Sequence, residues 1–151
     1  MPLSSARLMG PFDLDRATGF LDDTVIPLRL AAVAPSGWPL VVSLWFARDG
    51  DTLVCATQES SPLVTALARE PRCAFEVAGC EPPYHGVRGR AVVTVEPDVE
   101  LEILRRLVER YLGDAEGRFA AWLLGRTTPE VVLRLDPVEV SSWDYRGRMA
   151  G

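Results

Sequence analysis

The 151-residue chain is long enough for one domain, which at this size buries about 70% of its unfolded surface without needing a disulfide or a metal. Its 48% hydrophobic and 25% charged residues are typical of a globular protein, and the net charge of −5 argues against nucleic acids and anionic membranes as partners. All 16 basic residues are Arg, which excludes lysine Schiff-base chemistry.

The cysteines Cys55, Cys73 and Cys80 match no zinc or redox spacing. An odd number of apparently buried cysteines indicates reduced thiols, so we expect a cytoplasmic protein. The N-terminal residues show no pattern typical of a signal peptide, and no apolar run approaches the roughly 20 residues of a membrane helix.

The first half of the chain is predicted to hold two helices and four strands. Residues 1–24 form a tail with a short helix after Phe12. Ser61 is a favourable N-cap and Pro62 a favourable first residue for a helix that ends before Pro71. The strands, each bounded by turn residues such as Asp49-Gly50, are 26–34, 38–46, 52–57 and 72–78.

The second half is predicted to hold a long bent strand, two helices and two short strands. Gly86 and Gly89 indicate a bulge or barrel corner in the strand 84–95. Asp98 is expected to cap an amphipathic helix that Gly113 ends. The remaining elements are a helix over 114–124 and strands over 131–135 and 138–143, separated by Asp136-Pro137.

About six strands with a few helices favour a mostly β fold, in which an antiparallel sheet closes into a barrel, over alternating βαβ units. We expect this domain to span 25–146, preceded by the segment 1–24 and followed by a short tail, 147–151.

Polar groups gather where the strand ending at Thr57 leads into the helix capped by Ser61. Hydroxyls and the backbone amides of Leu63 and Val64 could form a phosphate cradle there, or the segment could be an ordinary capped helix. The candidate side chains are Thr57, Gln58, Ser60 and Ser61.

The order of these motifs resembles the pyridoxamine 5'-phosphate oxidase-like, flavin-binding split barrels, which include F420-dependent reductases. The residues that carry the resemblance, over roughly 25–146, are Pro39, Val41, Ser43, Trp45, Phe46, Asp49, Gly50, Thr57, Ser61, Leu67, Pro71 and Arg72. The resemblance implies a six-stranded split barrel that forms a homodimer, with the cofactor in grooves between the subunits.

The resemblance further implies an oxidoreductase that binds FMN, or alternatively F420, and passes a hydride to or from a small planar substrate. Thr57 and Ser61 occupy phosphate-contacting positions, and Trp143 stands where a tail residue contacts flavin or substrate. The strand bearing Val41, Ser43 and Trp45 would lie behind the flavin ring, although Trp45 could equally anchor the dimer interface.

Pro62-Leu63 departs from the family pattern, which has Arg-Lys at this point. Two lost charge-assisted hydrogen bonds would weaken phosphate binding by on the order of 10²–10⁴. Arg88 and Arg90 lie two apart, so they face the same side of a strand and could compensate, as could Arg29 or Arg72. The binding of F420 could depend less on one pair of basic residues, because its longer tail makes more contacts with the protein.

Two alternatives to an oxidoreductase stay open. Pro62-Leu63 would also suit a barrel dimer with weak or lost flavin binding that acts as a binding or structural protein. His85 could instead ligate haem, because some split-barrel relatives handle haem. No metal-binding pattern is present, and the sequence identifies no catalytic residue.

Overall fold

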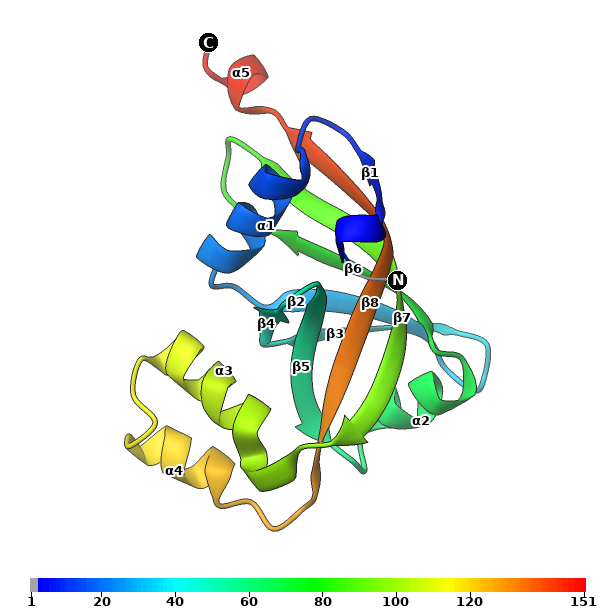
Figure 1. Cartoon of the computed structure of the whole chain (residues 1–151), viewed down its shortest axis with the longest axis vertical. Coiled ribbons are helices and arrows are strands. Elements are labelled where there is room, and N and C mark those ends of the chain that lie inside the picture. Colours follow the sequence, from blue (N-terminus) through cyan, green and yellow to red (C-terminus); the bar gives the residue numbers. More distant parts are fainter. Residues whose placement is uncertain (1–2) are drawn as a thin grey trace.

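The computed structural model describes residues 3–151, and its core is a single, mostly antiparallel sheet (Figure 1). The order of its strands is β3-β2-β6-β7-β8-β5-β4, and β1 pairs in parallel with β8. The strands are β1 Arg7–Met9, β2 Leu28–Val33, β3 Pro39–Leu44, β4 Phe46–Asp49, β5 Thr52–Gln58, β6 Arg72–Ala78, β7 His85–Pro97 and β8 Glu130–Asp144.

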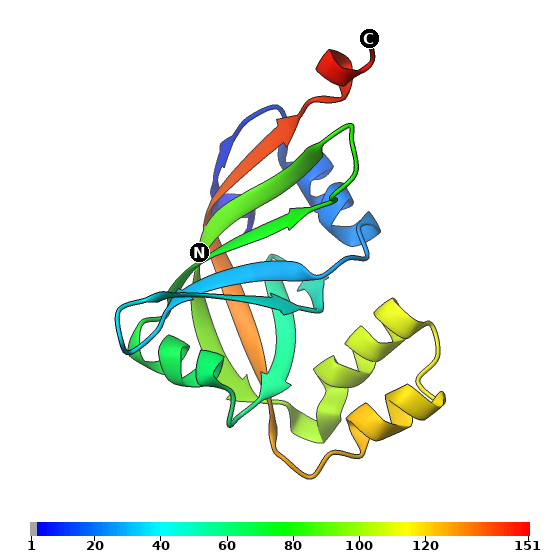
Figure 2. The same cartoon turned by 180° about the vertical axis from the view of Figure 1, so that it is seen from behind.

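The helices lie at the periphery of the sheet (Figure 1). They are α1 Leu14–Asp23, α2 Pro62–Arg69, α3 Glu102–Leu112, α4 Arg118–Leu124 and α5 Arg146–Met149, with 3-10 turns at Leu3–Ser5 and Val99–Leu101. Both views place α3 and α4 together at one end of the molecule and α5 at the other (Figure 2). Within residues 3–151, no helix is long and apolar enough to cross a membrane.

The predicted strand 38–46 is two strands, because Trp45 leaves the sheet between β3 and β4. These two strands are the ends of the sheet's hydrogen-bonded order, yet they follow each other in the chain. The link through Trp45 therefore closes the sheet into a split barrel.

The two strands predicted at the C-terminal end are one continuous strand, β8. Pro137 lacks an N–H group, but it lies opposite Ala91 where the register with β7 shifts, and a proline is tolerated at such an irregularity. The three-residue β1, which was not predicted, adds a further strand. The described residues therefore form eight strands rather than six, although the mostly β prediction is confirmed.

Gly89 permits the close approach of strands at the bend of β7. A Cβ at this position would lie 2.4 Å from the Glu139 carbonyl oxygen and 2.7 Å from the Phe75 ring. No side chain fits in that space unless its neighbours shift, and the register irregularity between Arg90 and Ala91 confirms the predicted bulge in this strand.

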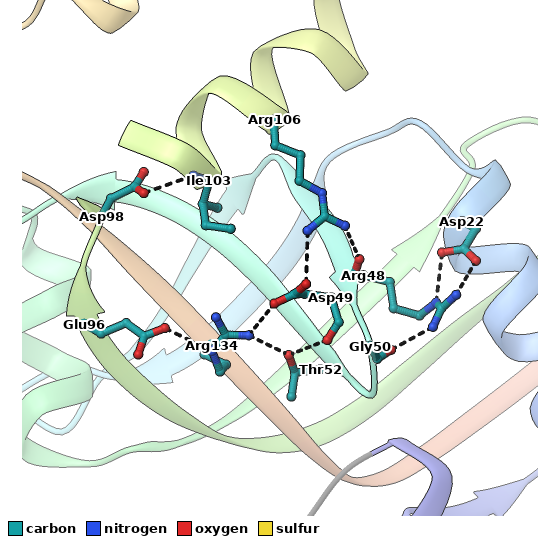
Figure 3. Close-up of polar contacts among 10 residues, drawn as sticks. All are labelled: Asp22, Arg48, Asp49, Gly50, Thr52, Glu96, Asp98, Ile103, Arg106 and Arg134. Carbon is teal, nitrogen blue, oxygen red and sulfur yellow. Dashed lines mark hydrogen bonds and ion pairs between the residues drawn. The ribbon is translucent and has the colours of Figure 1, made fainter. Parts of the chain in front are cut away.

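Polar contacts fix α3 against the β4–β5 hairpin (Figure 3). The Asp98 carboxylate accepts hydrogen bonds from the backbone amides of Ile103 at 3.0 Å and Leu104 at 2.9 Å, so it caps α3 as predicted, although the helix begins only at Glu102, after a 3-10 turn. The Asp49 carboxylate accepts hydrogen bonds from Arg134 at 2.8 Å and from Arg106 of α3 at 3.2 Å. This network positions α3 beside β4 and β5.

Candidate functional site

The outer face of the sheet carries a groove of about 530 Å³, here called the arginine groove. Cross-strand pairing explains its composition, because Arg29 pairs with Glu76 and Glu76 pairs with Arg88. In the next cross-strand row, the small residues Ala31 and Ala74 pair with each other and lie between Val41 and Arg90. The residues that line the groove include Arg29, Ala31, Val41, Ala74, Arg88 and Arg90.

The arginines of this groove are only loosely paired. Arg88 lies 3.6 Å from a Glu76 oxygen and Arg90 lies 3.9 Å from a Glu139 oxygen. Charge-assisted hydrogen bonds are shorter, near 2.8 Å, so these guanidinium groups keep donors for a ligand. The guanidinium of Arg88 also lies 4.2 Å from the centre of the Trp143 ring, which connects two predicted site residues.

A second groove of about 240 Å³, here called the aromatic groove, lies where the barrel meets α3 and α4. The barrel contributes Ser43, Leu44, Trp45 and Ala56, while the helices contribute Leu104, Leu107, Phe119 and Leu123. Arg126 completes the wall and is its only charged side chain among the described residues.

Arg126 was not predicted as a site residue. Its Nη2 donates to Glu130 Oε1 at 2.5 Å, and the Glu130 side chain is only 2% exposed. The buried Nε of Arg126 and Oε2 of Glu130 have no hydrogen-bond partner within residues 3–151. The only signal in the sequence was the spacing of four between two opposite charges, which is too common to mark a site.

The outward face of β3 joins the two grooves. Val41 borders the arginine groove, and Ser43, two residues further along the same face, borders the aromatic groove. Two residues of a strand span roughly 7 Å. A single elongated ligand on this face would therefore reach both grooves.

The N-terminus of α2 does not offer the two amides that the sequence suggested for a phosphate. The Leu63 amide donates to Ser61 Oγ at 3.2 Å, and the Val64 amide donates to the Ser61 carbonyl at 3.0 Å. By contrast, the side chains of Thr57, Gln58 and Ser60 make no hydrogen bond to any other residue of the described chain. They remain predicted ligand contacts.

Within one chain, this segment and the arginine groove lie far apart. Thr57 pairs with Val131, which pairs with Pro97 of β7. Arg90 lies seven residues before Pro97, which corresponds to roughly 23 Å along the strand. Arg88 and Arg90 therefore cannot serve a phosphate at Ser61 of their own chain.

The remaining candidates lie outside both grooves. Arg72 pairs with Glu70 at 2.7 Å, and its hydrogen bond lowers the pKa of that carboxyl to about 2. His85 lies edge-on to Phe20, with ring centroids 5.7 Å apart, in a separate pocket of about 310 Å³. No group of three metal-binding side chains occurs in the described part of the chain.

The cysteines differ in exposure. Cys55 and Cys73 are buried as expected, and burial raises the pKa of both thiols, to about 12 for Cys73. Cys80 is exposed, so the expectation of three buried thiols is wrong for this residue. It lies in the loop between β6 and β7 rather than in a strand.

The described residues form a split β-barrel with peripheral helices, a groove on the sheet and a second groove beneath α3 and α4. The sequence profile described as pyridoxamine 5'-phosphate oxidase matches residues 24–144. The chain therefore belongs to the pyridoxamine 5'-phosphate oxidase-like family, as its motifs indicated.

Solved structures agree with this assignment. A conserved hypothetical protein, Rv2991 from Mycobacterium tuberculosis, is 22% identical with a TM-score of 0.74, over 90% of this chain and 87% of that one. An F420 reductase is 25% identical with a TM-score of 0.65, over 80% of this chain and 93% of that one. The haem storage protein HutZ from Vibrio cholerae is 19% identical with a TM-score of 0.55, over 74% and 80%. No curated protein matches the chain.

Proposed function

We propose that the protein binds a deazaflavin of the F420 type on the outer face of β3 and acts as an oxidoreductase on a small planar substrate, with FMN as the alternative cofactor. The observation that carries the proposal is the placement of Val41 and Ser43, which connect an arginine-rimmed groove to an aromatic one. The bound cofactor would supply a hydride donor or acceptor.

The residues present fit a long anionic cofactor better than a compact phosphate at α2. The amides of Leu63 and Val64 are already bonded, and Pro62-Leu63 provides no cation. The arginine groove offers Arg29, Arg88 and Arg90 against two glutamates. Its volume of about 530 Å³ lies within the range of roughly 300–1,000 Å³ that is usual for ligand pockets.

In this arrangement, Arg88 and Arg90 would hold the anionic tail, and Val41 and Ser43 would lie beneath the ring. The small side chains of Ala31 and Ala74 leave an apolar floor between the arginines. The similarity to an F420 reductase, at 25% identity, supports the same choice of cofactor.

We also propose that the protein acts as a homodimer. Trp38 is 76% exposed and Val41 is 64% exposed, and both lie on or beside β3, at one end of the sheet order. Exposed apolar side chains that gather in one area often mark an interface. Sedimentation of the full chain tests this proposal, because a monomer at micromolar concentration would contradict it.

The variant Arg88→Ala/Arg90→Ala tests the cofactor proposal. The two side chains are 60% and 74% exposed, so we expect a loss of about tenfold in F420 affinity rather than the larger effect of buried charges. Arg72→Ala is the matched control, because Arg72 is 79% exposed and lies outside both grooves. Equal affinity of the double variant and the control would overturn the assignment of the arginine groove.

A further inference from the structure

The wall of the aromatic groove contains an ion pair whose hydrogen bonds are incomplete. Glu130 accepts one bond from Arg126 through Oε1, while its buried Oε2 and the buried Nε of Arg126 have no partner in residues 3–151. The Arg126 guanidinium also lies 5.5 Å from the centre of the Trp122 ring. Glu130 and Trp122 thus hold the Arg126 guanidinium at the groove wall, and its remaining N–H groups can donate hydrogen bonds to a ligand.

The charge of Arg126 is balanced by a carboxylate that is almost completely buried. A ligand at this wall would meet hydrogen-bond donors but little net positive charge. An uncharged acceptor gains a hydrogen bond there, whereas an anion would also be repelled by Glu130. The pair therefore favours a carbonyl-type oxygen over a carboxylate or a phosphate.

The remaining wall determines the shape of the ligand. Leu104, Leu107 and Leu123 are apolar, and Trp45 is held parallel to Tyr111, with a ring separation of 5.0 Å. The volume of about 240 Å³ is below the usual range for whole cofactors, roughly 300–1,000 Å³. A ligand of one or two flat rings suits this space.

We propose that the aromatic groove binds a small planar ring compound through an uncharged hydrogen-bond acceptor, that Arg126 recognises this acceptor, and that Glu130 positions Arg126. That this ligand is the substrate rests on the proposed function, since Ser43 places the groove next to the expected cofactor ring. The binding itself does not depend on a cofactor.

Three probes with one phenyl ring test the proposal on the cofactor-free full chain: acetophenone, ethylbenzene and benzoate. Chemical shifts of the Trp45 indole N–H and of the Ala56 and Leu104 amides report binding, and the Trp38 indole, which does not line this groove, is the reference signal. We expect acetophenone to bind about threefold to tenfold more tightly than ethylbenzene, although it is less hydrophobic, because it gains one hydrogen bond. Benzoate should bind more weakly than acetophenone.

Two variants separate recognition from structural support. Glu130→Gln keeps the shape of the side chain and an acceptor for Arg126 but removes the negative charge. The affinity for benzoate should therefore rise at least about threefold relative to the affinity for acetophenone. Arg126→Met alone would leave Glu130 buried without its cation, so the double variant Arg126→Met/Glu130→Gln is used instead. In it, the preference for acetophenone over ethylbenzene should disappear while ethylbenzene binding remains.

The proposal is overturned if ethylbenzene binds the natural chain as tightly as acetophenone, if the double variant keeps the preference, or if no probe shifts the groove signals. It is also overturned if Glu130→Gln leaves benzoate binding unchanged. A chain that binds acetophenone in this way but neither F420 nor FMN would retain this site and lose the proposed oxidoreductase function.

Discussion

The indole of Trp45 stacks on the phenol ring of Tyr111, with ring centroids 5.0 Å apart and ring planes 6° from parallel. The Tyr111 hydroxyl donates to the Ile26 carbonyl at 2.8 Å and accepts the Phe46 amide at 3.2 Å. These contacts connect α3 to the point where β3 passes into β4. Trp45, which links β3 to β4 and lines the aromatic groove, is thus held in place by a residue of α3.

Tyr111→Phe should destabilise the protein while preserving the stack. The substitution leaves the Phe46 amide without its acceptor in a partly buried position, which costs about 1–3 kcal/mol. Urea unfolding measures the loss, with Tyr145→Phe as the exposed control. A change below about 0.5 kcal/mol would show that the hydroxyl does not hold the β3–β4 junction.

Ser61→Ala decides whether Ser61 is a helix cap or a phosphate ligand. Because Ser61 Oγ accepts the Leu63 amide, we expect a loss of about 1 kcal/mol in unfolding free energy. Cofactor affinity should change less than about twofold, because no free amide remains beside it. Ser5→Ala, at an exposed serine outside this segment, is the control, and reduced affinity with unchanged stability would instead support the predicted phosphate cradle.

Asp49 should make stability depend on acid pH. The hydrogen bond from Arg134 is the main cause that lowers its pKa in the folded protein, with a further contribution from Arg106. The unfolded chain has the ordinary pKa of about 3.9 and therefore takes up the proton first. Stability from this group is present at neutral pH and is lost as the pH falls through about 4 and below.

The side chain of Asp49 is 42% exposed, so solvent limits this contribution to about 1 kcal/mol or less. Urea unfolding at neutral pH and near pH 3 measures it. Asp49→Asn should lose stability at neutral pH and show a smaller drop in acid than the natural chain. An equal acid dependence in both proteins would contradict the assignment.

Cys80 should be the only thiol that reacts quickly in the folded protein. It is exposed, whereas Cys55 and Cys73 are buried and have raised pKa values, which disfavours the reactive thiolate. Reaction with a thiol reagent should therefore show one fast equivalent, absent in Cys80→Ser, and two more after denaturation. Rapid modification of three thiols in the native state would contradict the buried core.

Local patterns predicted most of the fold. The capped helix α2 and the glycine at the β7 bend follow from chemistry within a few residues. The sequence did not reveal that Trp45 leaves the sheet, because its partner Tyr111 lies 66 residues away. Pro137 suggested a break in β8, but pairing with β7 both before and after this residue keeps the strand continuous.

The candidate site was harder to predict than the fold. The spacing of Arg88 and Arg90 correctly placed them on one face, and they meet Val41 in the arginine groove. The sequence could not show that Thr57 and Ser61 lie at a different part of the sheet, since strand register determines that distance. Arg126 was missed because only the packing of α4 makes it part of a groove.

Titration of the purified natural chain with F420 and FMN under the same conditions, followed by calorimetry, tests the central claim most directly. We expect saturable binding of F420 that is at least about tenfold tighter than that of FMN and that weakens with salt, because exposed arginines hold the tail. If neither cofactor binds below about 100 µM, the assignment as a deazaflavin or flavin oxidoreductase is contradicted.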